Sequence, residues 1–137
     1  MVRQSRISSA APVLLSFLRV VVGLNFCSHG IKKALTLFAG GQLPALLKWA
    51  CFLESVGGVL ILVGFFTVPV ALILSGEMAV GYFVQHFPKG ILPIQNGGEL
   101  AVLYCFIFLY FLAAGPGPIS LDHLFQSHKT GSQRTPG

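Results

Sequence analysis

Three ionisable side chains stand inside long apolar stretches of this sequence: Arg19, Glu54 and Glu77. An ionisable group costs a few kcal/mol in hydrocarbon and is normally paired or turned towards a cavity. At about 1.5 Å per helical residue, all three fall within one slab, roughly 12–18 Å from one membrane face. One arginine and two carboxylates at one depth predict an intramembrane charge cluster of Arg19, Glu54 and Glu77.

This charge cluster has two interpretations. In the first, the charges only fix how the helices assemble, because a wrong arrangement would leave a charge unpaired in the membrane. In the second, they relay protons or form a polar floor under a ligand pocket. The sequence alone leaves both open.

A second group of polar residues stands where the apolar stretches end. His29, His86 and Glu99 fall at one end of the predicted helices, and Lys33 lies at a similar height. We expect His29, Lys33, His86 and Glu99 to form a candidate site for a ligand head group, with capping of helix ends as the alternative. No metal site is predicted, because the histidines are not spaced i, i+4 and no dense ligand motif occurs. Three tyrosines could serve the same site or simply pack: Tyr82, Tyr104 and Tyr110.

The three cysteines are Cys27, Cys51 and Cys105. They form no CxxC motif, so a thioredoxin-type dithiol is absent. We interpret them as small packing residues. A redox role across two helices stays open.

The elements that must position these residues follow from composition. The chain of 137 residues is 54% hydrophobic and only 9% charged, far from the usual soluble protein. It contains apolar stretches long enough to cross a bilayer as helices. We predict an all-α, polytopic membrane protein: a single domain of residues 1–137, folded as a four-helix transmembrane bundle with a polar, loose tail at 126–137. The four spans are about 11–30, 46–66, 68–87 and 98–114.

Two connections carry further signals. Residues 88–98 hold two prolines and two glycines, so they cannot form regular helix, and their apolar character predicts that they fold back over the end of the bundle. Ser120 is placed to cap a short helix that begins at Leu121 and lies at the membrane interface.

The charge pattern bears on partners and topology. Nine Lys and Arg against four Asp and Glu give a net charge of +5, but they form no basic run, so we expect a lipid bilayer and no nucleic acid as partner. We place both termini in the cytoplasm, although the positive charges are evenly divided. One side holds Arg3, Arg6, Lys129 and Arg134, and the other holds Lys32, Lys33, Lys48 and Lys89.

Over residues 18–122 the sequence resembles the DoxX family of small four-helix membrane proteins. The resemblance rests on Arg19, Gly23 and "HGIKK" in the first span, with Lys33 at the family's lysine position. It continues through "ESVGGVLILVGFFTVP" at 54–69. It is strongest over "SGEMAVGYFVQHFPKGILPIQNGGELAVLYCFIFLYFLAAGPGPISLD" at 75–122.

The resemblance implies a four-helix bundle firmly and a redox role loosely, since a fold does not fix a function. The family takes its name from a subunit of a terminal quinol oxidase system, and other members look like partners in membrane redox complexes. We therefore expect a bacterial inner-membrane protein that serves as a quinone-linked oxidoreductase subunit or accessory. Its cofactor would be a quinone, and its partner would be a redox protein or a second copy of the chain.

Two other functions remain open. Distant relatives of the family act in cargo export and receptor assembly, so the alternative is a non-enzymatic assembly factor or scaffold whose charges lock the bundle. A transporter of protons or small molecules is the third, although inverted repeats are absent. No haem, flavin or iron–sulfur motif is present, so any electron donor should be a partner or a bound small molecule.

Overall fold

α1 begins at Val2 and runs without a break to Phe38 in the computed structural model, which describes the backbone of residues 2–131 and the side chains of residues 9–128. Helices account for every regular element in that range. The elements after α1 (Val2–Phe38) are α2 (Ala45–Val63), α3 (Thr67–Gly81), the π-helix η1 (Tyr82–His86), the 3-10 helix η2 (Phe87–Lys89), α4 (Pro93–Asn96), α5 (Glu99–Ala114) and α6 (Leu121–Gly131).

The membrane-spanning elements confirm the predicted fold class. Three helical stretches are long and apolar enough to cross a bilayer: Ser9–Phe38, Ala45–Val63 and Thr67–Lys89. α5 is equally apolar but has 16 residues, about 24 Å of helix, so it falls short of a full bilayer core. The first helix continues to Phe38, beyond the predicted span end at residue 30, because nothing between 31 and 38 breaks a helix before Gly40 and Gly41. Lys33 therefore lies on α1 and not in a loop.

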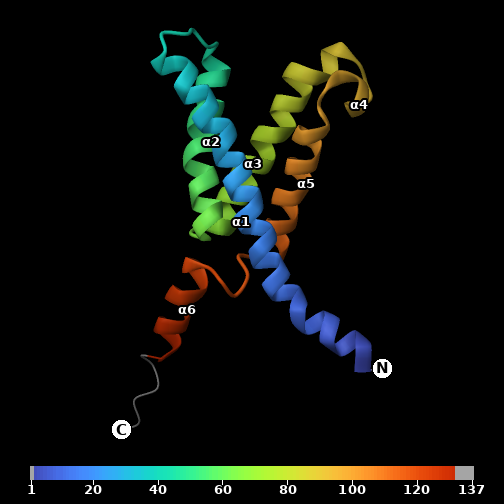
Figure 1. Cartoon of the computed structure of the whole chain (residues 1–137), viewed down its shortest axis with the longest axis vertical. Helices are drawn as coiled ribbons and strands as arrows, with labels where there is room; N and C mark the ends of the chain where they lie inside the picture. Colours follow the sequence, from blue (N-terminus) through green and yellow to red (C-terminus); the bar gives the residue numbers. More distant parts are fainter. Residues whose placement is uncertain (1, 132–137) are drawn as a thin grey trace.

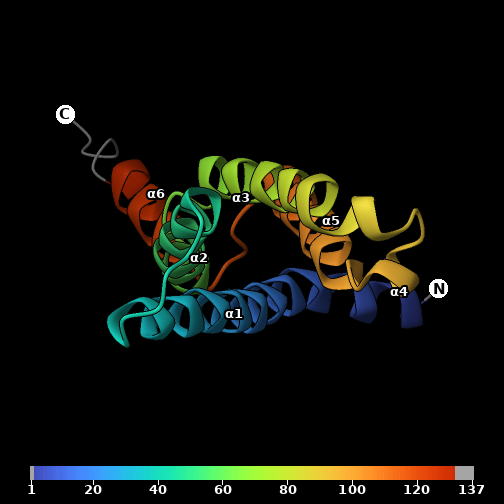
Figure 2. The ribbon, with the colours of Figure 1, turned by 90° about the horizontal axis from the view of Figure 1, so that it is seen from above.

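The helices are arranged as two pairs. α1 packs along α2 and α3 packs along α5, while the contact between α2 and α3 is less extensive. Figure 1 shows the two pairs crossing near the end that carries α6 and diverging towards the end that carries α4. The view from above in Figure 2 separates α1 and α2 from α3 and α5. We call these two ends of the bundle the Arg19 end and the His86 end.

Small residues bring α1 and α2 together. A Cβ added at Gly23 would stand 2.5 Å from the backbone nitrogen of Leu62, and one at Gly58 would stand 2.6 Å from that of Cys27. Only glycine permits so close an approach of two membrane helices. Gly23 and Gly58 are therefore packing residues of the contact between α1 and α2.

Aromatic rings join α1 to α5. Phe26 is buried and meets Phe108 edge-on at a ring-centroid distance of 4.9 Å, and Tyr104 at 5.3 Å. Ile61 and Leu74 complete this core from α2 and α3. The core therefore lies where the two pairs cross, and most other large apolar side chains face outward, as a bilayer solvent requires.

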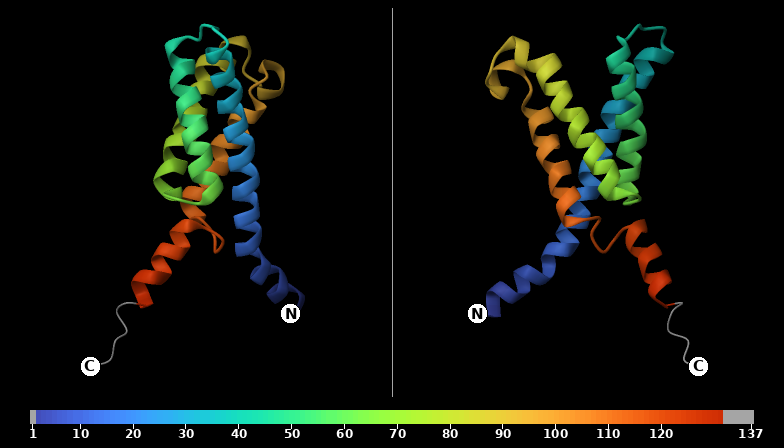
Figure 3. Two further views of the ribbon diagram at one scale, coloured as in Figure 1. Left: turned by 60° about the vertical axis from the view of Figure 1, so that its left-hand side comes forward. Right: turned by 180° about the vertical axis from the view of Figure 1, so that it is seen from behind.

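The segment after α5 closes the Arg19 end. Ser120 accepts the backbone N–H of His123 at 3.2 Å, which confirms the predicted cap. The Asp122 carboxylate accepts the N–H groups of Phe66 and Thr67, both at 2.9 Å, and so caps α3 from another segment. Figure 3 shows α6 leaving the bundle at this end. The predicted polar tail is helical as far as Gly131, which corrects its loose character over 126–131.

The remaining predicted tail residues, 132–137 with Arg134, lie outside the described residues, as do the side chains of Arg3, Arg6 and Lys129.

The chain returns from α3 to α5 without long regular helix, as predicted. Pro88 has no N–H to continue the α-helical ladder, and its ring crowds the preceding turn. The helix widens into η1, where the N–H of Phe87 bonds the carbonyl of Tyr82. A one-turn α4 and two left-handed glycines, Gly90 and Gly97, complete the return.

Candidate functional site

Arg19 is almost completely buried, at 1% exposed, and is bonded to backbone carbonyls. Its Nη1 donates to Ile61 O and to Leu62 O at 2.6 Å. Its Nε donates to Pro116 O at 2.9 Å, and its Nη2 donates to Ile119 O. The guanidinium thus ties the end of α2 to the segment before α6.

This geometry corrects the predicted charge cluster, because Arg19 does not join Glu54 and Glu77. The last turn of a helix exposes carbonyls without intrahelical partners, and a guanidinium carries five donors that fit several of them. The C-terminal end of α2 supplies that partner closer to Arg19 than either glutamate. A prediction from the depths of charged side chains does not include these carbonyls, since they belong to the backbone.

Lys33 on α1 and Glu54 on α2 form the ion pair that the structure does contain. Lys33 Nζ lies 2.6 Å from Glu54 Oε1. Glu54 is 5% exposed, and its Oε2 has no hydrogen-bond partner among the described residues. Lys33 was predicted for the head-group site, and the structure instead pairs it with a member of the charge cluster. The pair depends on the helical extension of α1 beyond residue 30.

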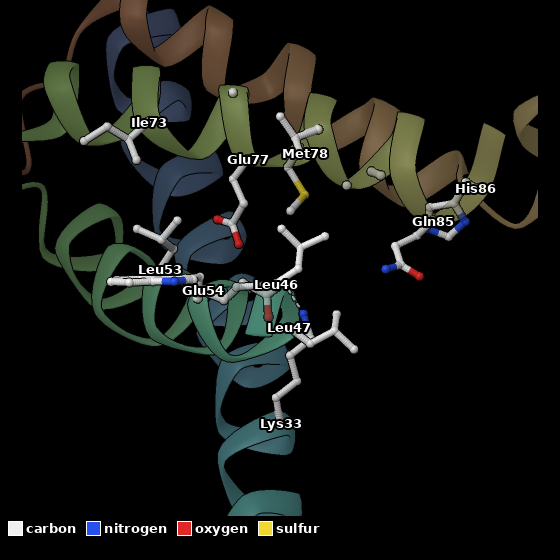
Figure 4. A pocket seen from close by; sticks show the side chains of 16 residues that line it. Lys33, Leu46, Leu47, Leu53, Glu54, Ile73, Glu77, Met78, Gln85 and His86 are labelled. Atoms are coloured by element: carbon white, nitrogen blue, oxygen red, sulfur yellow. Dashed lines mark hydrogen bonds and ion pairs between the residues drawn. The ribbon is translucent and has the colours of Figure 1, made fainter. Parts of the chain in front are cut away.

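Glu77 projects from α3 into the space between the helix pairs. Figure 4 shows its carboxyl group pointing towards Glu54 on α2, with Lys33 reaching Glu54 from α1. Both oxygens of Glu77 are buried, and neither has a hydrogen-bond partner in the described part of the chain. Glu54 and Lys33 both act on Glu77 electrostatically. Glu54 and Glu77 therefore line one cavity, with Lys33 in the place where Arg19 was predicted.

A cavity of about 360 Å³ surrounds these groups. Lys33, Glu54 and Glu77 form its polar wall, and Gln85 and His86 close its other end, as Figure 4 shows. The rest of the wall is largely apolar, including Leu46, Leu47, Trp49, Leu53, Ile73 and Met78. This size and a mostly apolar wall with a few polar groups are typical of small-molecule sites.

A second hollow of about 230 Å³ adjoins the first, and Met78 and Ala101 are among the residues that line both. His29, His86 and Tyr104 line it together with Phe26. Glu54 and His86 line both spaces, and so connect the two predicted groups of residues. We call the first space the acidic cavity and the second the aromatic hollow.

The π-helix and the return loop position His86. His86 Nδ1 lies 3.2 Å from the carbonyl of Asn96. The buried Asn96 side chain donates to Gly90 O at 2.7 Å and accepts the N–H of Gly98 at 2.8 Å. Tyr82 donates to Ile91 O at 2.9 Å. A π-helix is often found at functional sites, and here the network holds the imidazole at the shared wall.

Glu99 takes no part in either space. It is exposed at the first position of α5, where an acidic residue favours the positive end of the helix dipole. The predicted grouping of His29, Lys33, His86 and Glu99 is therefore divided. His29 and His86 line the aromatic hollow, Lys33 lines the acidic cavity, and Glu99 faces outward. Of the tyrosines, Tyr104 lines the hollow, Tyr82 braces the loop and Tyr110 is exposed.

The cysteines pack between helices and are free thiols. The Cys51 Sγ lies 3.5 Å from Gly30 O, and the Cys27 Sγ lies 3.8 Å from Ser55 O, both across the α1–α2 contact. Cys105 meets Ser75 between α5 and α3. Among the described residues, no three His, Cys, Asp or Glu side chains converge as a metal site.

Sequence reasoning missed several wall residues of the acidic cavity. Trp49 and Gln85 carry no motif, and Gly76 and Gly81 look like ordinary small residues of a membrane helix. A usable signal existed only for Lys33, because the absence of a helix breaker before Gly40 places it on α1, where it can reach the neighbouring helix.

Comparison with known proteins bears on the chain as a whole. The family model for DoxX, a family of small membrane proteins, matches residues 14–87, which is more than half of the chain and includes Lys33, Glu54, Glu77 and His86. A Haemophilus influenzae protein described as an uncharacterized protein is 45% identical over 123 residues. That match covers 83% of this chain and 92% of the relative. No solved structure matches the chain.

Proposed function

Because the chain belongs to the DoxX family of small membrane proteins, we propose that it binds the head group of a quinone in the aromatic hollow. It would serve there as a subunit or accessory of a membrane redox complex. The family supplies the link to quinol oxidation, and the hollow supplies a site of suitable chemistry.

One observation carries this proposal: Glu54 Oε2 is a buried acceptor without a partner in the described part of the chain. Glu54 lines both the acidic cavity and the aromatic hollow. Leaving a buried acceptor unsatisfied costs about 1–3 kcal/mol. A quinol hydroxyl is a donor that removes this cost. The rings of Phe26 and Tyr104 offer the apolar faces against which a quinone ring packs.

The chemistry required of the protein is limited. A quinol that is oxidised releases two electrons and two protons. Glu54 and His86, at the wall shared with the acidic cavity, are placed to accept protons. The electrons must pass to a redox partner, because the sequence carries no haem, flavin or iron–sulfur motif.

The test is quinone binding by the purified protein in detergent. A short-chain ubiquinol, which carries the hydroxyl donors, should bind saturably, and His86→Ala should weaken binding at least about tenfold, since one hydrogen bond to a buried group contributes on the order of 1.4 kcal/mol. His123→Ala on α6, which is exposed and lines neither space, is the control. Equal binding by the two variants, or no saturable binding by the native protein, would reject the head-group site.

A scaffold is the second candidate function, and the bonding of Arg19 favours it. The guanidinium is satisfied by backbone carbonyls and therefore acts on assembly, not on a ligand. A protein that only presents a fixed bundle to a client would need this tie and neither hollow. Normal client assembly by a His86→Ala variant that has lost quinone binding would select the scaffold.

We also propose that the membrane is the bacterial inner membrane and that both termini lie in the cytoplasm. The support is that the beginning of α1 and the whole of α6 lie at the same end of the bundle, as Figure 1 shows. An even number of crossings requires this arrangement.

A further inference from the structure

The acidic cavity has an uneven distribution of charge. Lys33 lies on Glu54 at 2.6 Å and offsets its charge. Arg19, the remaining candidate partner for a glutamate, is bonded to carbonyls at the Arg19 end. Glu77 is left without a hydrogen-bond partner among the described residues. With its carboxyl groups ionised, the cavity therefore carries one negative charge more than it carries positive charges.

The groups that face Glu77 come from several elements. α1 contributes Lys33, α2 contributes Glu54 and η1 contributes His86. The wall contributed by α5 is Ala101, which is apolar and uncharged. Among the described wall residues, Lys33 is the one lysine or arginine, and it is already engaged by Glu54; His86, the other group that can carry a positive charge, closes the far end of the cavity.

The apolar part of the cavity wall is suited to an apolar body. Trp49 is 67% exposed and lines the cavity, and an indole face attracts cations as well as apolar groups. Met78 is a flexible side chain that adapts to different shapes. Gly76 and Gly81 leave open space, since a Cβ added at either would meet nothing within 4 Å.

We propose that the acidic cavity binds a lipophilic monocation, an ammonium or phosphonium group on an apolar body. Its positive charge lies against Glu77, and its body packs on Trp49 and Met78. Because the exposed Trp49 lines the cavity, an amphiphile dissolved in the bilayer would enter it beside that side chain. This inference concerns Glu77 and does not depend on quinone binding in the aromatic hollow.

Two probes of nearly the same shape and opposite charge test the proposal: tetraphenylphosphonium and tetraphenylborate. Trp49 is the single tryptophan of the sequence, so its fluorescence reports binding at the cavity wall. In detergent, the cation should quench it saturably, and the anion should not. Glu77→Gln should weaken cation binding at least about tenfold, because it removes a full charge at contact distance.

The variant Glu77→Gln preserves the fold, since the described structure gives this carboxyl no hydrogen bond to lose. Lys33→Gln should act in the opposite direction and strengthen cation binding, because it uncovers Glu54. Glu99→Gln on the exposed start of α5 is the matched control and should change nothing. Gly76→Leu should abolish binding by filling the cavity, with melting measured to verify folding.

Equal quenching by the two probes would indicate partition into the detergent and would overturn the proposal. Unchanged cation affinity in Glu77→Gln would do so as well. Loss of quinone binding in His86→Ala together with intact cation binding would leave this inference standing and would separate it from the proposed function.

Discussion

Replacing Arg19 by methionine should destabilise the bundle strongly, because it removes the hydrogen bonds to the carbonyls of Ile61, Leu62, Pro116 and Ile119. A side-chain hydrogen bond between membrane helices contributes about 0.6 kcal/mol on average. A charged donor to a buried carbonyl contributes about 1.5 kcal/mol or more. The four bonds named here therefore bracket the loss in unfolding free energy between roughly 2 and 6 kcal/mol.

The assay is unfolding in mixed micelles with increasing dodecyl sulfate, followed by far-ultraviolet circular dichroism. Arg19→Lys should fall between the native protein and Arg19→Met, since an ammonium carries three donors on one nitrogen and cannot reach all four carbonyls of the two segments. Amide exchange should increase first in α6, which the tie holds to the end of α2.

A double variant distinguishes the observed bonding of Arg19 to carbonyls from the pairing of Arg19 with Glu77 that their similar depth in the membrane suggests. Arg19→Met and Glu77→Gln should have effects on stability that add within about 0.5 kcal/mol, because the two side chains share no described partner. A coupling above about 1 kcal/mol, or a loss below about 1 kcal/mol for Arg19→Met alone, would refute the reasoning.

Three further predictions follow from the same structure. Asp122→Asn should lower stability by about 1 kcal/mol in the same unfolding assay, since it weakens the cap on α3; no change would show that the cap is dispensable. Gly58→Ala should cost about 1–3 kcal/mol because its Cβ meets the backbone of α1, whereas Gly76→Ala should be nearly neutral; equal melting temperatures would contradict the close packing. Short tags at both ends should resist external protease in intact cells; cleavage of both tags would reverse the proposed orientation, and cleavage of one alone would contradict the placement of both termini on one side.

Much of the fold follows from local sequence. Three apolar stretches have the length of a bilayer crossing and a fourth is slightly shorter, and Gly40, Pro69 and Pro88 lie near the ends of helices. Ser120 signals a helix start by its side chain alone. These properties depend on neighbouring residues, so they can be read before the chain is folded.

The candidate site depends on non-local geometry, and sequence reasoning identified its members better than their partners. Sequence reasoning singled out Glu54 and Glu77 as costly charges in the membrane, and His29 and His86 as polar residues at the ends of helices. The structure brings these residues to the walls of two adjacent spaces. Lys33 was grouped with His86, and both line the acidic cavity, but its pairing with Glu54 was not foreseen because it requires α1 to continue past residue 30.

The sequence by itself determined that this protein is a helical membrane bundle and that its few buried charges must be satisfied, because hydrocarbon penalises them wherever the helices go. Only the tertiary structure decided which partner each charge has. Arg19 donates hydrogen bonds to backbone carbonyls at the end of α2. Every residue has such a carbonyl, so residue types do not indicate which ones are available. Glu77 is left facing a cavity, because the helix pairs diverge there and leave space between them. Whether two charges pair depends on the distance between their helices. Helix packing sets that distance, and the depth of each residue along its own helix does not.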